Sequence, residues 1–439
     1  MKSRSYFKEF IRYVSLNILG MLGLSFYILA DTFFISNGLG ARGLTALNLA
    51  IPIYSIVHGC GLMLGMGGAT KYSTYKGSGN RRTADIIFTH TLLMGIVLAV
   101  LFALCGLFLS GTITSLLGAD SEVYQMTHIY LKVILLFAPA FMLNDIFVCF
   151  VRNDGNPGLS MAAMLTGSLA NVLLDYIFIF PLQMGIFGAV LATGLAPVIS
   201  MLILSRHLVK RKNQFHFAKG KFMPGLAASI LSPGFPSLVT EVSSGIVIII
   251  FNTIILGLLG NVGVAAYGII ANLSLVVMSI YTGIAQGIQP LISRAKGAGD
   301  NENIRHILRY AIAVLVGLSC MIYLAVFLFA SPIASVFNSE NNPQLQAIAI
   351  TGMKIYFTAV IFAGFNIIIS VFFTSTGHSA PAHVASLLRG LIIIVPMAFL
   401  LSAVGGIMGV WLTFPLTELL VALFLLWQSC RGRKDLHLT

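Results

Sequence analysis

Carboxylate side chains stand inside stretches of this chain that are otherwise apolar. Asp31 lies in the run from Tyr13 to Ile35, and Asp175 lies in the run from Leu159 to Phe180. A carboxylate in the apolar interior of a membrane costs about 2.5–3.5 kcal/mol on insertion scales, so it usually faces a cavity or a partner. Asn171 precedes Asp175 by four residues, which places both side chains on one helix face. Together these residues could present several oxygens to one small cation.

Two further acids and one histidine fall in apolar runs with weaker indications of a role. Glu241 stands alone in a mostly apolar run, and we interpret it as a second, separate anionic position for substrate. Asp145 precedes Arg152 and a polar turn, so a structural role is as well supported as a functional one. His58 is interpreted as a hydrogen-bonded packing residue. Asp31 and Asp175 could instead be capped by neighbouring polar residues and serve only helix packing, but we favour a functional role for both.

The chain repeats itself at a spacing of about half its length. The repeat is visible at shifts of 220 to 222 residues, which pair Leu39-Gly40 with Leu259-Gly260, Lys76-Gly77 with Lys296-Gly297, Lys132 with Lys354, Asn144 with Asn366, Gly155 with Gly377, and Gly185-Ile186 with Gly406-Ile407. We therefore expect an N-terminal lobe over residues 1–205, a basic linker over 206–224, and a C-terminal lobe over 225–439. Two equivalent lobes with a site between them are typical of secondary transporters.

The duplication allows the two halves to be compared position by position. Asp31 corresponds to Phe251 at a shift of 220, whereas Asn171 and Asp175 correspond to Ile393 and Met397 at a shift of 222. A purely structural polar group would be expected in both copies. The asymmetry indicates an ion or proton site in the first lobe only.

The composition predicts an all-α integral membrane protein. Hydrophobic residues make up 57% of the chain and charged residues 9%, whereas about a quarter of residues are charged in soluble domains. Runs of about 20 apolar residues, enough to cross a bilayer as a helix, occupy twelve stretches: Tyr13–Ile35, Leu44–Gly68, Ile86–Leu109, Ile129–Val151, Leu159–Phe180, Gly185–Ser205, Gly234–Leu259, Val264–Ile292, Ile307–Phe329, Ile350–Phe373, Val384–Ala403 and Met408–Trp427. We expect twelve transmembrane helices in two six-helix bundles.

The net charge of +12 reports membrane orientation, and the placement of the basic residues excludes a nucleic-acid partner. They gather in segments that fall on one side of the membrane if the spans alternate: Lys2, Arg4, Lys8 and Arg12; Lys71, Lys76, Arg81 and Arg82; Arg206, Lys210, Arg211, Lys212, Lys219 and Lys221; Arg294, Lys296, Arg305 and Arg309; and Arg431, Arg433 and Lys434. The opposite connections contain Asp120, Glu122 and Glu340. The positive-inside rule places both termini in the cytoplasm. The basic linker also suits contact with anionic lipid head groups.

Neither metal nor disulfide chemistry is indicated by the cysteines. All five are solitary and lack the C-x-x-C spacing of a metal or redox site.

The first apolar run follows a basic start, but it is too long for a signal peptide and no A-x-A site closes it, so we expect it to remain as the first span.

Several motifs resemble the multidrug and toxic compound extrusion (MATE) family, and the likeness extends over nearly the whole chain. It is carried by Ala30-Asp31-Thr32-Phe33-Phe34-Ile35, by Arg152 and Gly155, by Asn171-Val172-Leu173-Leu174-Asp175, and by the segment from Gly185 to Thr193. The segment from Phe150 to Pro157 and that from Asn171 to Pro181 look most similar to the MepA-like bacterial branch.

The resemblance implies two six-helix bundles in a bacterial plasma membrane. Such proteins export lipophilic cationic drugs or dyes by alternating access, in exchange for protons or sodium ions, and need no cofactor. By motif, the coupling site would contain Asp31, Asn171, Asp175 and Thr193, with Asn144 the nearest match to a further asparagine. Glu241 is the candidate for a glutamate that some relatives use, and substrate would contact Glu241, Asp31 and Asp175. We expect a monomer.

Three other classes of protein fit the sequence less well. A lipid-linked oligosaccharide flippase of the same superfamily would need cationic side chains inside several spans, whereas only Arg389 stands in such a position. A major facilitator carrier would have an aspartate before the basic pair Arg81-Arg82. A membrane-embedded enzyme would need convergent nucleophilic and acid or base groups, or a metal cluster. We therefore expect a transporter and no enzyme activity.

Overall fold

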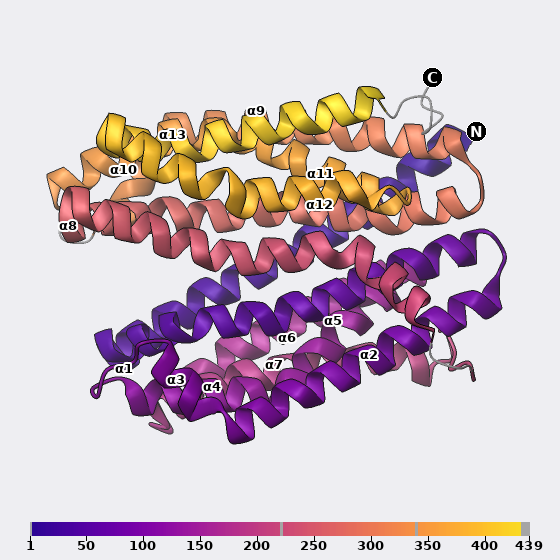
Figure 1. Ribbon diagram of the computed structural model, residues 1–439, viewed down its shortest axis with the longest axis horizontal. Coiled ribbons are helices and arrows are strands. Elements are labelled where there is room, and N and C mark those ends of the chain that lie inside the picture. Colours follow the sequence, from indigo (N-terminus) through magenta and orange to yellow (C-terminus); the bar gives the residue numbers. More distant parts are fainter. Residues whose placement is uncertain (1, 220–222, 339–340, 432–439) are drawn as a thin grey trace. The chain divides into compact units, whose positions relative to one another are not determined.

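A computed structural model describes residues 2–219, 223–338 and 341–431, with side chains from Tyr6 onward. Lys221, Glu340, Arg433 and Lys434, which entered the topology argument, lie outside the described residues. Every regular element in the described part is a helix (Figure 1). In chain order the elements are α1 (Lys2–Gly77), α2 (Arg81–Phe108), α3 (Ser110–Leu116), α4 (Tyr124–Leu136), α5 (Ala138–Asn153), α6 (Pro157–Ile179), α7 (Gly185–Val209), α8 (Pro224–Gly297), α9 (Asn301–Phe337), α10 (Pro343–Tyr356), η1 (Phe357–Ala359), α11 (Val360–Ser375), α12 (Ser379–Leu387), η2 (Leu388–Ile392) and α13 (Ile394–Arg431).

The two longest helices are hairpins that turn at a glycine. As a straight rod, the 76 residues of α1 would measure about 114 Å, far more than the thickness of a bilayer. Gly40 instead has φ 65° and ψ −159°, a conformation open to glycine because it lacks a Cβ atom. The hydroxyls of Tyr27 and Tyr54, one on each side of this turn, are 3.2 Å apart. α1 therefore contributes two antiparallel segments.

The corresponding turn in the second half has almost the same geometry. Gly260 in α8 has φ 63° and ψ −157°, and the rings of Phe251 and Tyr267 stack across it with centroids 5.4 Å apart. Positive φ also recurs at further pairs that the repeat predicts: Gly79 and Gly299, Gly155 and Gly377, and Gly185 and Gly406. The internal duplication is thus present in the backbone as well as in the sequence.

The expected twelve spans are recovered once these turns are taken into account. Eight helices of the described residues are long and apolar enough to cross a membrane, and the α4–α5 pair, bent by 47°, makes a ninth. α1 and α8 each divide at their glycine, and α13 divides at Gly406, where φ is 55°. The result is six segments up to Val209 and six from Pro224 onward. The all-helical fold class is confirmed.

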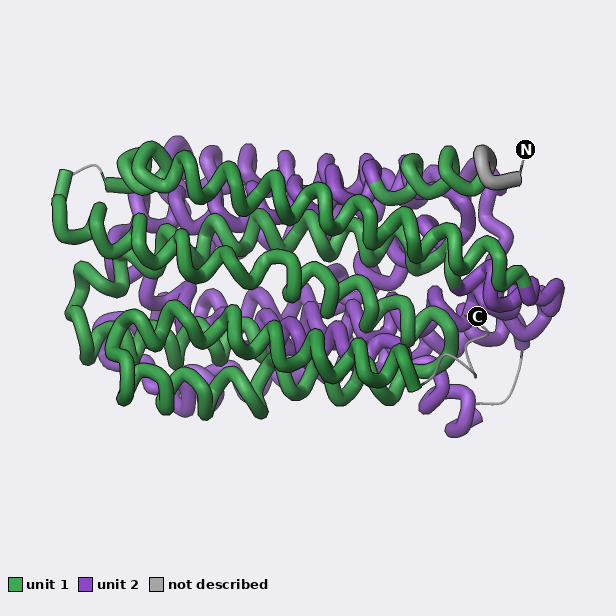
Figure 2. The backbone as a smooth tube through the Cα atoms, turned by 90° about the horizontal axis from the view of Figure 1, so that it is seen from above, with its two compact units in different colours: residues 1–14, 243–292, 300–439 green, residues 15–242, 293–299 purple. Residues whose placement is uncertain are grey.

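The chain forms two compact units, coloured separately in Figure 2. One unit comprises residues 15–242 and 293–299, and we call it the acidic-site unit; the other comprises residues 1–14, 243–292 and 300–439. These units follow packing in space and do not coincide with the sequence repeat. The lobes 1–205 and 225–439 remain a prediction from the sequence.

Small residues bring α6 and α7 of the acidic-site unit together. A Cβ atom on Gly167 of α6 would lie 3.1 Å from the carbonyl oxygen of Ala196 in α7, so the two backbones are close. In the same way Gly194 of α7 accommodates the ring of Phe137. Close approach of this kind is how helices associate in membranes, where no hydrophobic effect drives them together. It places the polar residues of α6 and α7 next to each other.

A buried aspartate ties the connection after α7 to one end of the acidic-site unit. Asp154 lies in the turn between α5 and α6 and is buried. Its Oδ1 atom accepts hydrogen bonds from the Tyr72 hydroxyl at 2.7 Å and the Lys76 ammonium at 2.6 Å. Its Oδ2 atom faces His207 Nε2 at 2.9 Å and accepts from the backbone N–H of Gln214 at 2.7 Å. One carboxylate therefore fastens α1, α7 and the segment after α7.

These partners determine the charge state of Asp154. Burial alone would raise the pKa of Asp154, but the hydrogen bonds from His207, Lys76 and the Gln214 backbone outweigh it and hold the pKa below its ordinary value. A lowered pKa in the folded state means that the native state is stabilised at pH values above the ordinary pKa of about 3.9. That stabilisation is lost as the pH falls through the folded-state value.

We predict that Asp154→Asn destabilises the detergent-solubilised protein at pH 7 by roughly 1–3 kcal/mol, because the Lys76 ammonium loses its buried acceptor. The difference between wild type and variant should persist at pH 5 and shrink below about pH 4, where the wild-type carboxyl is also protonated. Thermal unfolding followed by tryptophan fluorescence at several pH values measures this. Glu122→Gln, at an exposed carboxylate, is the control, and a difference that is constant from pH 7 to pH 3 would contradict the prediction.

Candidate ion and substrate site

The structure brings Asp31 and Asp175 together although they are distant in sequence. Asp31 comes from the first segment of α1 and is 7% exposed, whereas Asp175 comes from α6 and is fully buried. Their carboxyl groups lie within hydrogen-bonding reach of each other. Both belong to the acidic-site unit. We call this pair the acid pair.

Asn171 and Thr193 complete the predicted set around the acid pair. With the amide nitrogen of Asn171 turned toward Asp175, it donates to Asp175 Oδ2 at 3.0 Å, and the amide oxygen accepts from the backbone N–H of Thr193 at 3.2 Å. The hydroxyl of Thr193 donates to the carbonyl of Ala189 in its own helix at 3.1 Å. Four of the five predicted coupling residues therefore meet, from α1, α6 and α7.

Asn144, the fifth predicted coupling residue, is not joined to this group by a hydrogen bond in the described structure. It lies in α5, and its Oδ1 atom is buried without a hydrogen-bond partner. Its neighbour in sequence, Asp145, belongs to a different set of contacts, described below.

Tyr130 of α4 is a part of the site that the sequence did not reveal. Its hydroxyl lies within hydrogen-bonding reach of Thr193, and Asp31 and Asp175 are close enough to act on it electrostatically. The side chain is buried. One tyrosine among many aromatic residues in apolar runs carries no distinguishing sequence signal, so only the packing of α4 against α7 identifies it.

The acid pair has no cationic side chain to balance it. Neither Asp31 nor Asp175 forms a salt bridge with any described residue, and the Oδ1 atoms of both are buried without a hydrogen-bond donor. Two ionised carboxylates side by side in a medium of low dielectric constant repel each other strongly. A proton or a small cation between them removes that repulsion. The acid pair is therefore a candidate site for a proton or a small cation.

The surrounding atoms suit a hard cation as well as a proton. They are carboxylate, amide and hydroxyl oxygens, the type of ligand that hard cations prefer. Within the described residues no group of three His, Cys, Asp or Glu side chains gathers as a metal site. An oxygen-rich group of this kind is compatible with a proton or with a hard cation.

A second acidic group lies in the same unit, around His58. Its Nδ1 atom is 2.9 Å from Asp145 Oδ2, so Asp145 pairs with His58 and not with Arg152. Arg152 instead donates to Asn17 Oδ1 at 2.9 Å. Glu241, half-buried in α8, is near enough to act electrostatically on His58. His58 is thus a hydrogen-bonded residue, as the sequence suggested, and its partner is Asp145.

Two tyrosines lie between the acid pair and the His58 group. Tyr27 precedes Asp31 by four residues on the same helix face, and Tyr54 precedes His58 by four. The Tyr27 and Tyr54 hydroxyls are 3.2 Å apart, and the rings of Tyr54 and His58 stack with centroids 5.7 Å apart. The hairpin of α1 therefore places two acidic groups on either side of one hydroxyl pair.

Glu418 is an intramembrane carboxylate that the sequence analysis missed. It lies in α13 of the other unit and is 1% exposed. Its Oε1 atom accepts from Arg389 at 2.7 Å and 3.1 Å, and its Oε2 atom accepts from the Asn366 amide at 2.7 Å. Arg389 lies in the π-helical turn η2. The run Met408–Trp427 still reads as an apolar span because Glu418 is its one charged residue.

The chain is similar to known proteins over most of its length. The family model described as MatE matches residues 17–177 and 236–400. The multidrug export protein MepA of Staphylococcus saprophyticus is 25% identical over 421 residues, which cover 95% of this chain and 92% of the relative. MepA of Staphylococcus aureus strain MRSA252 is 26% identical with the same coverage.

Solved structures agree with this fold. A multidrug resistance MATE family transporter of the MOP superfamily, in an outward-facing conformation, has a TM-score of 0.91 at 24% identity, covering 98% of this chain and 97% of that chain. A MOP superfamily transporter from Pyrococcus furiosus, whose reverse binding-pocket polarity suggests a different function, has a TM-score of 0.89 at 24% identity, covering 98% and 96%. These likenesses confirm the fold and do not identify the cargo.

We predict that Glu418→Gln lowers stability by about 3–5 kcal/mol, because it leaves the Arg389 charge buried without its partner. The paired replacement Arg389→Met with Glu418→Met should recover most of the loss, since both charges are then absent. Thermal unfolding in detergent measures the three proteins. A double variant as unstable as the single one would contradict a structural role for this ion pair.

Proposed function

We propose that this chain, which belongs to the MatE family of membrane transporters, is a secondary active exporter of lipophilic organic cations. Members of this family are transporters and not enzymes, and the MepA relatives are multidrug export proteins. The alignment with them extends along 95% of this chain. Membership of the MatE family and the length of the alignment with MepA support multidrug export as the activity.

The observation that carries the proposal is the buried acid pair without a balancing cation. Asp31 and Asp175 can hold a proton or a sodium ion, with Asn171 and Thr193 next to them. If the loaded and unloaded pair favour different conformations, ion binding shifts the equilibrium between them. By linkage, the ion and the exported compound then change each other's affinity. Downhill ion entry thereby drives uphill export by alternating access.

The acidic groups also suit cationic substrates. Glu241 is half-buried near His58 and Asp145, and together with Asp31 and Asp175 it supplies negative charge that a lipophilic cation would seek. The chain contains 31 Phe and 17 Met residues. Aromatic and thioether side chains adapt to flat apolar molecules of differing shape. A broad range of drug or dye cations is the expected substrate class.

The alternative is a lipid-linked oligosaccharide flippase of the same superfamily. Such a protein must hold phosphate with cationic side chains inside the membrane. Arg389, the candidate for that role, is already bound by Glu418. The structure of this ion pair therefore favours drug export over lipid flipping.

We infer a single orientation in the bacterial plasma membrane, with both termini in the cytoplasm, and a monomeric protein. The basic residues at one end of the spans support this orientation. Protease cleavage of a C-terminal tag in right-side-out and inside-out vesicles measures it. We predict cleavage in inside-out vesicles only, and cleavage in intact right-side-out vesicles would contradict the assignment.

For the transport activity we predict that ethidium moves through proteoliposomes containing this protein when a proton gradient or a sodium gradient is imposed. Asp31→Asn or Asp175→Asn should reduce gradient-driven flux by about tenfold or more, because a neutral amide cannot exchange the coupling ion. Applying each gradient separately, with the other ion symmetric, identifies the ion.

The matched control is Glu302→Gln, which removes an exposed carboxylate. Flux in this variant should equal that of the wild type. Full flux in both aspartate variants would disprove ion coupling through the acid pair. Absence of ethidium movement under either gradient, with folded wild-type protein, would favour the lipid-linked substrate.

A further inference from the structure

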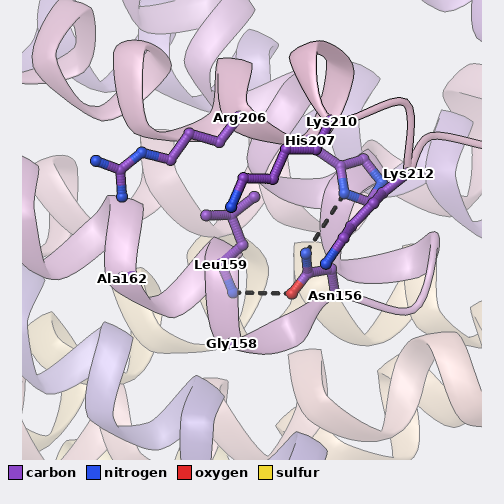
Figure 3. Close-up of a pocket in the computed structure, with 8 residues that line it drawn as sticks. All are labelled: Asn156, Gly158, Leu159, Ala162, Arg206, His207, Lys210 and Lys212. Atoms are coloured by element: carbon purple, nitrogen blue, oxygen red, sulfur yellow. Dashed lines mark hydrogen bonds between the residues drawn. The ribbon is translucent and has the colours of Figure 1, made fainter.

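A basic pocket lies where α6 begins and α7 ends, in the acidic-site unit (Figure 3). It has a volume of about 320 Å³. Arg206 and Lys210 enter it from the end of α7, and Lys212 enters from the turn that follows. Figure 3 shows Lys210 and Lys212 reaching toward the first turn of α6, and Arg206 running toward Ala162. Nothing in the transport proposal uses this pocket.

The three cations of the basic pocket are not neutralised by the protein. None of them has a salt bridge to any described residue, and all three side chains belong to exposed residues. Asp154, the carboxylate that contacts the pocket residue His207, is buried and has both oxygens occupied by Tyr72, Lys76, His207 and Gln214. The pocket therefore carries an uncompensated positive charge.

The wall formed by Asn156 and His207 is fixed by hydrogen bonds. Asn156 Nδ2 lies 3.4 Å from His207 Nδ1, and His207 Nε2 lies 2.9 Å from Asp154 Oδ2. The Asn156 amide and the Asp154 carboxylate thus contact the two ring nitrogens of His207. His207 is thereby held in place by Asp154. It supplies a rigid side to the pocket.

The start of α6 adds backbone donors to the same pocket. Asn156 caps the helix by accepting from the N–H of Leu159 at 3.2 Å. Gly158, the second residue of α6, also lines the pocket, and no acceptor is present for its N–H within the described residues. The first N–H groups of a helix point outward and carry partial positive charge, which attracts phosphate. Side chains and backbone therefore favour the same kind of ligand, an oxyanion.

Apolar surface continues from the pocket along both helices. Leu202 lies one turn before Arg206 on the same face of α7 and is 65% exposed, and Leu169, seven residues after Ala162 on α6, is 69% exposed. On membrane-spanning helices such exposed leucines face acyl chains. An anion that lies above an acyl-covered face is the head group of a lipid, whereas a soluble phosphate would gain nothing from that face.

We propose that the basic pocket binds the phosphate head group of an anionic phospholipid. The phosphate lies against Arg206, Lys210, Lys212 and the N–H of Gly158, and the acyl chains lie along the apolar faces of α6 and α7. Since α7 leads directly into the segment that Asp154 fastens, the bound lipid holds this end of the unit at the membrane surface. This inference does not depend on the transported substrate.

Direct lipid binding tests the proposal. The full chain in a neutral detergent is titrated with phosphatidylglycerol, and binding is read by native mass spectrometry and by the rise in unfolding temperature. The variant Arg206→Ala/Lys210→Ala/Lys212→Ala should bind phosphatidylglycerol about tenfold more weakly than the wild type. All three residues are exposed, so this variant should fold.

Matched controls separate the pocket from general surface charge. Arg81→Ala/Arg82→Ala/Lys219→Ala removes the same number of exposed cations outside the pocket and should leave binding unchanged. The exchange Arg206→Lys/Lys210→Arg/Lys212→Arg keeps the charge and should retain binding. Equal losses in the two alanine variants would overturn the proposal.

Two further arms distinguish the source of the phosphate. Zwitterionic phosphatidylcholine should bind more weakly than phosphatidylglycerol, because it brings its own cation to the pocket. Glycerol 3-phosphate, which has the phosphate without acyl chains, should not displace the bound phosphatidylglycerol at equal concentration. Displacement by glycerol 3-phosphate, or equal binding of the two lipids, would refute an anionic lipid site.

Discussion

An ionised side chain inside a bilayer has no water to stabilise it, so a charge within these helices needs a partner supplied by the protein. Arg389 has Glu418 and Asn366, Arg152 has Asn17, and Asp145 has His58. Asp31 and Asp175 face each other without a salt bridge to any described residue. Because the same physical requirement applies to all of them, this exception is the reason why we propose the acid pair as the place where a mobile ion is held.

Helix packing determines where these partners meet. The turn at Gly40 folds α1 back on itself and places Tyr27 beside Tyr54, so that two acidic groups lie near one hydroxyl pair. Small residues on α6 and α7 bring Asn171 and Asp175 next to Thr193. The turn at Gly260 shows that the second half has the same backbone conformation at the corresponding position. The second half has no acidic residue at the positions that correspond to Asp31 and Asp175, and its buried Arg389 and Glu418 form an ion pair with each other.

Outside the apolar segments, a buried charged side chain holds parts of the chain together. Asp154 gathers hydrogen-bond donors from α1, α7 and the segment after α7. Because Asp154 is occupied in this way, it leaves Arg206, Lys210 and Lys212 without compensation. The positive charge of these three residues therefore stays available for the anionic lipid that we propose. The proposed ion site and the proposed lipid pocket occupy separate parts of one unit.

The sequence by itself determined the helical class, the duplication and the family, because apolar runs, spacing and motifs are local properties of the chain. The family motifs also predicted the set Asp31, Asn171, Asp175 and Thr193 as the coupling site. It predicted Asn171 and Asp175 on one face because helical periodicity relates residues four apart. Only the tertiary structure decided that Asp31 meets Asp175, that Tyr130 joins them, and that His58 pairs with Asp145. Glu418 stands alone in an apolar run, the same signal that identified Glu241, and only the structure showed its partner Arg389, 29 residues away. Which helices pack together depends on side-chain fit between distant segments, and that information is not contained in the periodicity of any one of them.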